Sequence, residues 1–178
     1  MLSLLGSYQP ENAMNVLNAV DILCELGFKI DDSCVYAGLR DVKWPARFEI
    51  INRDPLVIAD GGHNPEGIDG AVESVKQYFD EKVGIVTGVM ADKDYRYMAS
   101  RIAEVADTVF CLTPDNPRAL KASDYAEVFE SLGVSASSFA TVDEAVDAAM
   151  KWGREVGRPI VCLGSLYMYG EIRKSMER

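Results

Sequence analysis

The sequence carries little basic charge for its length. Its 178 residues include 18 lysines and arginines but 28 acids, which gives a formal net charge of −10 at pH 7. Surfaces that bind nucleic acid or an anionic membrane need a basic face. The composition therefore argues against both kinds of partner. Any phosphate ligand would have to be held by a few local cations and by helix N-termini.

Cysteines and long apolar runs are also scarce. The four cysteines show neither metal-type spacing nor a disulfide framework: Cys24, Cys34, Cys111 and Cys162. This usage predicts a reducing compartment, and we expect a cytoplasmic protein. No apolar run approaches the roughly 20 residues of a membrane-spanning helix.

Three common functional motifs are missing. The dinucleotide fingerprint GxGxxG and the phosphate-binding pattern GxxxxGK[ST] do not occur. The hydrolase elbow GxSxG is absent too, because Ser165 is not followed by glycine two residues later. A hydrolase triad would also need His63, the only histidine, as its base. Ordinary dinucleotide binding, a P-loop and hydrolase chemistry are therefore unsupported.

The most informative stretch runs from residue 56 to residue 79. An apolar run over 56–59 predicts a buried strand, and helical spacing of apolar residues begins after Asn64. Asn64 suits a helix N-cap and Pro65 suits the first turn. Asp60 then ends a strand and His63 precedes a helix, where ligands bind in open α/β sheets. The alternative is a tight connection with a capping aspartate and an incidental histidine.

After residue 44, short apolar runs alternate with amphipathic helical patterns. Strands are predicted over 48–51, 56–59, 83–89, 109–112 and 159–163, with one more near Phe139. This order predicts an α/β fold, a three-layer Rossmann-like arrangement around a mostly parallel sheet. A turn cluster over 52–55 predicts that the first two strands form a hairpin, with an antiparallel strand at the sheet edge.

Residues 1–43 have a different character. Residues 2–5 resemble the end of a strand, a helix is predicted over 10–26, and a second helix runs from Asp31 or Asp32 to Leu39. These elements are too few to bury a core. We therefore expect 1–43 to be the end of a larger upstream domain. The linker at Trp44–Arg47 would lead into an α/β domain over 44–178.

Polar side chains follow four of the predicted strands, and such strand ends converge at one edge of a parallel sheet. They are Asp60 and His63, the group 92–94 with Lys93, the loop that carries Arg118, and Ser165. Each has a plainer interpretation. The 92–94 group could be solvated capping charges, and Ser165 could be an N-cap.

Five short motifs occur in a telling order: Trp44-Pro-Ala-Arg-Phe-Glu49, Asp60-Gly-Gly-His-Asn-Pro65, Asp92-Lys-Asp94, Pro117-Arg-Ala119 and Gly164-Ser-Leu-Tyr167. This order resembles the C-terminal domain of folylpolyglutamate synthases, called dihydrofolate synthases when bifunctional, within the Mur ligase superfamily. Gly6-Ser-Tyr-Gln9 and Asn12 resemble the last part of that family's central ATPase domain. Gly62 stands where the folate enzymes more often have alanine.

The resemblance implies an ATP- and Mg²⁺-dependent ligase. A folate carboxylate attacks ATP to give an acyl phosphate, and the amine of glutamate then displaces phosphate. By resemblance, Arg47 would reach the ATP phosphates and Asp60 the ribose hydroxyls, with the carboxylate pointing into a ligand crevice. His63 would lie near the nucleotide or glutamate, and Ser165 would help to place glutamate. Three further residues would line the cofactor site: Asn64, Lys93 and Arg118.

Two alternatives stay open at this point. The chain could belong to a peptidoglycan-precursor ligase of the same superfamily, or it could be a non-catalytic α/β nucleotide-binding module. The family holds its phosphates and Mg²⁺ mainly in an upstream P-loop domain. We therefore expect this chain alone to be inactive, and no metal ligands are predicted within it.

Overall fold

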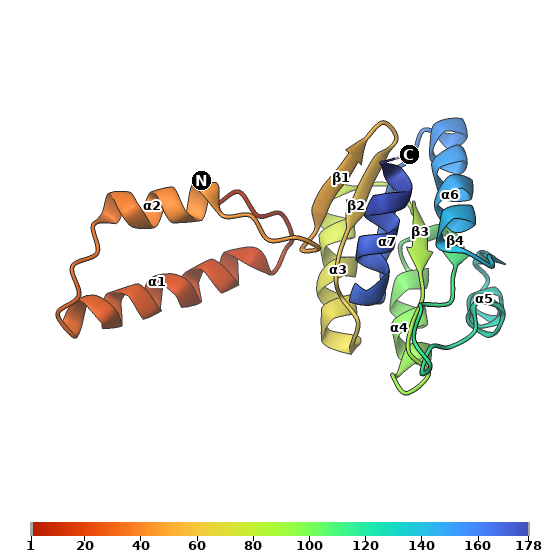
Figure 1. Ribbon diagram of the computed structural model, residues 1–178, viewed down its shortest axis with the longest axis horizontal. Coiled ribbons are helices and arrows are strands. Elements are labelled where there is room, and N and C mark those ends of the chain that lie inside the picture. The colour runs from red at the N-terminus through yellow and green to blue at the C-terminus, as the bar shows by residue number, and fades with distance from the viewer. Residues whose placement is uncertain (1, 178) are drawn as a thin grey trace.

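A computed structural model describes residues 2–177, and its centre is a six-stranded sheet. Figure 1 shows this sheet with the helices around it. The strand order is β1-β2-β6-β3-β4-β5, and every pairing is parallel except that of β1 with β2. The strands are β1 (Glu49–Arg53), β2 (Leu56–Ala59), β3 (Val83–Thr87), β4 (Ala106–Cys111), β5 (Ser135–Ser138) and β6 (Ile160–Leu163). The predicted α/β class with an antiparallel edge strand is confirmed.

Helices cover both faces of this sheet. One face carries α3 (Pro65–Tyr78), α4 (Tyr95–Ala103) and α5 (Ala122–Ser131), and the other carries α6 (Val142–Val156) and α7 (Leu166–Met176). Neighbouring residues of each strand point to opposite faces, so Ile85 packs with the first group and Val86 with the second. The apolar runs in the sequence are continuous because both faces of the strands are buried.

The first two strands form the predicted hairpin. Glu49 pairs with Ala59 and Arg53 with Leu56, with an irregularity between Ile50 and Asn52. The turn contains a cis peptide bond at Asp54–Pro55. Since β2 also pairs with β6, the hairpin leaves β1 as the antiparallel edge.

One local prediction is wrong. Residues 2–5 form no strand; Ser3 instead donates hydrogen bonds to Leu39 and Val42 of the N-terminal segment. The strand predicted near Phe139 is β5, which ends at Ser138, directly before that residue.

Helices α1 (Gln9–Glu25) and α2 (Asp32–Asp41) stand away from the sheet and run antiparallel to each other (Figure 1). Gln9 is the only residue of these two helices that is buried. Several large apolar side chains of the segment are exposed, including Met14 at 56% and Leu26 at 72%. The two helices therefore lack the apolar packing that stabilises most helices in proteins.

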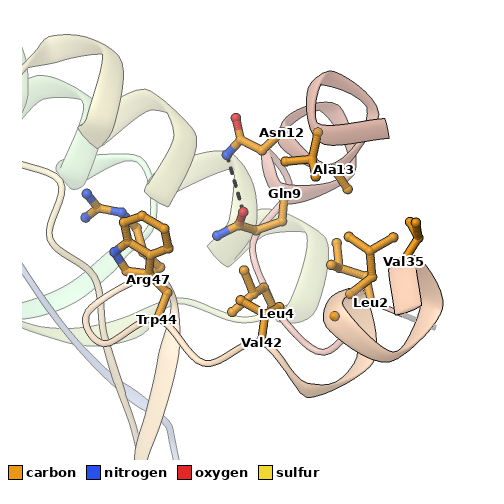
Figure 2. A pocket seen from close by; sticks show the side chains of 12 residues that line it. Leu2, Leu4, Gln9, Asn12, Ala13, Val35, Val42, Trp44 and Arg47 are labelled. Atoms are coloured by element: carbon orange, nitrogen blue, oxygen red, sulfur yellow. Dashed lines mark hydrogen bonds between the residues drawn. The ribbon is translucent and has the colours of Figure 1, made fainter. Parts of the chain in front are cut away.

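An apolar pocket of 420 Å³ lies between α1, α2 and the linker (Figure 2). Its walls are mainly aliphatic, with Leu2, Leu4, Val35 and Val42 facing the space and Trp44 near its end. No helix between residues 2 and 177 combines the length and apolar character needed to cross a lipid bilayer.

Candidate functional site

The carboxyl ends of β2, β6 and β3 lie side by side, because these strands are neighbours in the sheet. Ala59 pairs with Cys162, and Cys162 pairs with Val86, so the segments that follow the three strands leave the sheet at the same edge. The Gly164 N–H donates to the Gly62 carbonyl at 2.8 Å and joins two of the exits directly. This edge carries the loops in which the site residues were predicted.

Gly164 makes that junction possible. Its φ is +111°, a conformation that favours glycine. An added Cβ would also lie 2.6 Å from Thr87 Oγ1 and 2.7 Å from the Gly88 carbonyl oxygen. The loops after β6 and β3 therefore approach more closely than a side chain would allow.

The first pocket at this edge has a volume of 330 Å³. It lies between the start of α1, the linker and the turn from β2 to α3. Four of the predicted site residues line it: Arg47, Asp60, His63 and Asn64. Tyr8 and Asn12 of the N-terminal segment complete the wall.

Asp60 is 6% exposed, and it accepts three hydrogen bonds from the protein. Oδ1 accepts from the Gly62 N–H at 2.8 Å, and Oδ2 accepts from the Phe48 N–H at 2.9 Å and from the Tyr8 hydroxyl at 2.8 Å. Burial raises the pKa of this carboxyl, while the three donors oppose the shift. The Asp60 side chain thus lines the pocket and also fixes the turn. The sequence suggested these two roles, a ligand contact and a capping aspartate, as alternatives.

Arg47 lies between two residues with left-handed backbone, Ala46 at φ 55° and Phe48 at φ 50°. Both neighbours are buried and held by hydrogen bonds. The Ala46 carbonyl accepts from the Gly61 N–H at 2.8 Å, and the Phe48 N–H donates to Asp60. Positive φ in residues other than glycine costs free energy and persists where the surroundings enforce it. The fold therefore presents Arg47 at the pocket from a rigid backbone.

Gly61 lies directly beneath this arginine. A Cβ there would meet Arg47 Nη1 at 2.7 Å and Leu166 Cδ2 at 2.4 Å. The absence of a side chain lets Arg47 and the start of α7 close over the turn. The sequence marks Gly61 only as a turn glycine and gives no sign that it packs against Arg47.

His63 and Asn64 end the turn. His63 is exposed, and its Nδ1 lies 2.9 Å from the Gly61 carbonyl oxygen, which accepts a hydrogen bond when Nδ1 carries the proton. Nε2 is then an acceptor available to a ligand. Asn64 caps α3, because its Oδ1 accepts from the Gly67 N–H at 2.9 Å. The positive end of α3 thus faces the first pocket.

A second pocket of 290 Å³ adjoins the first, and His63 lines both. The remaining predicted site residues line this second pocket: Lys93, Arg118 and Ser165. Leu166 and Tyr167, both part of the Gly164–Tyr167 motif, add apolar and aromatic surface, as does Met90, which the sequence did not single out. The structure therefore brings all seven predicted site residues to two adjoining pockets.

A backbone hydrogen bond and an ion pair join the loops that carry Lys93 and Arg118 in the second pocket. The Ala91 N–H donates to the Arg118 carbonyl at 2.8 Å, and Arg118 Nη1 pairs with Asp92 at 3.0 Å. Lys93 has no ion pair within residues 2–177. Ser165 is buried and caps α7, since its Oγ accepts from the Tyr167 N–H at 3.3 Å. The pocket therefore combines two cations with a helix N-terminus, which suits an anionic ligand.

The side chains of the two pockets do not form a metal-binding cluster. Across residues 2–177, no group of three or more histidine, cysteine, aspartate or glutamate side chains is placed to hold an ion. The four cysteines are free, and Cys111 and Cys162 are buried. The two pockets thus present cations, backbone N–H groups and the carboxylates of Asp60 and Glu66, but the described residues form no metal centre there.

This fold and these strand-end pockets define a class of ligase domain. Residues 46–166 match the family model described as "Mur ligase, glutamate ligase domain". The chain belongs to this family.

Similar proteins point to one branch of it. The folylpolyglutamate synthase of Lacticaseibacillus casei is 33% identical over 175 residues, which cover 97% of this chain and 39% of that protein. The Mycobacterium tuberculosis folylpolyglutamate synthase, solved with ADP and AMPPCP, aligns with a TM-score of 0.88 and 28% identity over 99% of this chain and 42% of that one.

A third similar structure is a bifunctional folylpolyglutamate synthase/dihydrofolate synthase with Mn, AMPPNP and L-glutamate bound. It aligns with a TM-score of 0.78 and 27% identity over 90% of this chain and 38% of that one. The chain thus spans about two fifths of the length of these relatives.

Proposed function

We propose that this chain is the part of an ATP-dependent folate–glutamate ligase that places the nucleotide and the incoming glutamate. The observation that carries the proposal is the pair of adjoining pockets that share His63. One suits a nucleotide and the other suits a small dicarboxylate. A ligase that joins an ATP-activated acid to an amino acid needs these two ligands next to each other.

The first pocket offers what a nucleotide requires. Arg47 supplies a guanidinium for phosphate oxygens, and the N-terminus of α3 supplies free N–H groups. Asp60 supplies a carboxylate that can accept from a ribose hydroxyl. Asn64 contributes through the helix that it caps. The ADP and AMPPCP complexed with the M. tuberculosis enzyme support a nucleotide ligand.

The second pocket suits glutamate. Lys93 and Arg118 were expected at the cofactor, but they line the second pocket, so we propose instead that they provide positive charge for the carboxylates of glutamate. Ser165 provides a hydroxyl at the start of α7. His63 lies where the two pockets meet, so it can contact the amine of glutamate or the phosphate that leaves. The L-glutamate bound in one similar structure supports this class of ligand.

The described residues offer no site of their own for the divalent metal ion that such a ligase uses. With no cluster of ligating side chains within residues 2–177, this part of the protein would contact the ion only through the nucleotide. We propose Mg²⁺ as the cofactor, with its ligands outside these residues. The Mn bound in a similar structure supports a divalent ion.

We further propose that residues 1–43 belong to an upstream P-loop domain and that residues 44–178 form the C-terminal domain. The exposed apolar faces of α1 and α2 and the 420 Å³ pocket between them support this division. Exposed apolar surface of this kind marks a contact with another protein part. The free cysteines are consistent with a cytoplasmic protein.

The test compares the complete natural polypeptide that contains these residues with the 178-residue chain alone. We expect ATP-dependent addition of labelled glutamate to a folate by the former and none by the latter. Addition of an amino acid to a peptidoglycan precursor instead, or no ligase activity with any acid, would refute the folate assignment. Turnover by the 178-residue chain alone would refute the division into domains.

A further inference from the structure

Tyr8 is the residue through which the N-terminal segment touches the carboxylate of the first pocket. Its hydroxyl donates to Asp60 Oδ2 at 2.8 Å, across 52 positions of sequence. The ring lies on Gly70 of α3, where an added Cβ would be 3.0 Å from Tyr8 Cδ1. Gly6 also lies close to the ring: its φ of +108° turns the chain, and an added Cβ there would be 3.2 Å from the ring. The ring thus lies against one glycine of the segment and one of the helix.

The hydrogen bonds of Asp60 occupy most of the acceptor positions of its carboxylate. A carboxylate offers about four acceptor positions, two on each oxygen. Oδ2 already accepts from the Tyr8 hydroxyl and the Phe48 N–H, while Oδ1 accepts only from the Gly62 N–H. One acceptor position therefore remains, and it is on Oδ1.

We propose that Tyr8 is a positioning residue of the nucleotide pocket: by holding Asp60 Oδ2, it leaves Oδ1 to accept from one ribose hydroxyl of the nucleotide and not from both. The inference rests on the proposed function, which places a nucleotide in this pocket. It also links the N-terminal segment directly to nucleotide binding, because Tyr8 precedes α1 by one residue.

A second anchor of the same segment allows positioning to be separated from simple tethering. The Ser7 N–H donates to Ser74 Oγ at 2.8 Å, and the two hydroxyls lie 3.1 Å apart. Neither serine contacts Asp60 in the hydrogen bonds of the described residues. Ser74→Ala therefore loosens the segment and leaves the bond from Tyr8 to Asp60 in place.

The experiment uses the complete natural polypeptide that contains these residues. ADP, 2′-deoxy-ADP and 3′-deoxy-ADP are titrated by calorimetry into the parent protein, Tyr8→Phe, Ser74→Ala and Tyr36→Phe. Tyr36→Phe is the matched control, because it also removes a tyrosine hydroxyl from the same segment, but from a side chain that is 68% exposed. Thermal melts confirm that each variant is folded.

We expect the parent protein to lose affinity, about tenfold, for one deoxy nucleotide and less than about twofold for the other. Tyr8→Phe should bind ADP about 3- to 10-fold more weakly, and this loss should disappear with the deoxy nucleotide that lacks the bonded hydroxyl. Ser74→Ala and Tyr36→Phe should leave the discrimination between the two deoxy nucleotides as in the parent.

Different failures have different meanings. Equal affinity of the parent for all three nucleotides would overturn the ribose contact itself, and with it the nucleotide role proposed for Asp60. Discrimination by Tyr8→Phe equal to that of the parent would overturn only the role of Tyr8. So would an equal loss for all three nucleotides in Tyr8→Phe, since that pattern indicates tethering.

Gly70→Ala gives a second way to test the role if Tyr8→Phe does not fold. The new methyl group would push the Tyr8 ring while the hydroxyl is kept, and alanine favours helix at this position of α3. We expect the discrimination between the deoxy nucleotides to shrink in this variant as well. Unchanged discrimination, with the Tyr8 ring displaced in a crystal structure, would contradict the proposal.

Discussion

The hydroxyl of Tyr169 donates to Glu49 Oε2 at 2.6 Å, and the same oxygen accepts from the Ala46 N–H at 2.9 Å. The two residues are 120 positions apart in the sequence. Arg173 extends the contact, since its Nη1 lies 3.2 Å from the Tyr169 hydroxyl and 3.6 Å from Glu49 Oε1. Helix α7 thereby supports the left-handed backbone that presents Arg47.

From this contact we predict the effect of Tyr169→Phe. The variant removes a partly buried hydrogen bond to a charged group, which contributes about 1.5–3 kcal/mol to the free energy of unfolding. Because Tyr169 is only partly buried, we expect the lower end of this range. Urea unfolding measures the change. Tyr167→Phe, two residues away and 59% exposed, is the control and should change stability little.

Asp60→Ala should destabilise the domain as well as weaken nucleotide binding. The substitution leaves the Gly62 and Phe48 N–H groups and the Tyr8 hydroxyl without their acceptor. Each unsatisfied buried donor costs about 1–3 kcal/mol, and partial access to water lowers the sum to roughly 2–4 kcal/mol. Urea unfolding of Asp92→Ala, an exposed carboxylate at the same edge, should show less than about 0.5 kcal/mol of change.

The same carboxylate should give stability a specific pH dependence. Burial raises the pKa of Asp60 above the roughly 3.9 of an unfolded chain. The folded state therefore binds the proton more tightly, and the free energy of unfolding contributed by this group falls as pH rises from about 4 through the folded pKa. Above that value the contribution is constant. Asp60→Asn should lack this decline in urea unfolding above about pH 4, and a parallel decline in both proteins would contradict the assignment.

The cysteines should react in two separate pairs. Cys24 and Cys34 are exposed, whereas Cys111 and Cys162 are buried in strands, and burial raises the pKa of each buried thiol to about 12. Thiolates are the reactive species, so only the exposed pair should react with a disulfide reagent at about pH 8. The other two should react after urea unfolding. Four fast thiols in the folded protein would show that the sheet opens readily.

These features differ in how far the sequence could predict them. The strand ends at Asp60 and Ser165 were predictable, because apolar runs bounded by Gly-rich turns and N-caps are local signals. The left-handed backbone at Ala46 and Phe48 was not, since it depends on hydrogen bonds with Gly61 and Asp60, which come from another segment.

The site residues illustrate the same limit. Their convergence at one sheet edge followed from the parallel topology, but their division into two pockets depends on the position of His63 between them. Tyr8 belonged to a recognised motif, yet its bond to Asp60 crosses 52 residues and has no periodic signature. Contacts between distant segments carry no local pattern, and only the fold reveals them.

The last prediction separates the two pockets by kinetics. Arg47 and Arg118 are both arginines at the same sheet edge, but each lines a different pocket. In the complete polypeptide, Arg47→Ala should raise the KM for ATP, and Arg118→Ala should raise the KM for glutamate. Each lost charged contact is worth about 1.5–3 kcal/mol, which corresponds to roughly 10- to 100-fold. The exposed ion pair of Arg118 with Asp92 contributes little to stability, so Arg118→Ala should melt like the parent. Arg154→Ala on the distant helix α6 is the control and should change neither constant. If Arg118→Ala weakened ATP binding and left glutamate unaffected, the second pocket would be part of the nucleotide site, and the proposed place of glutamate would be wrong.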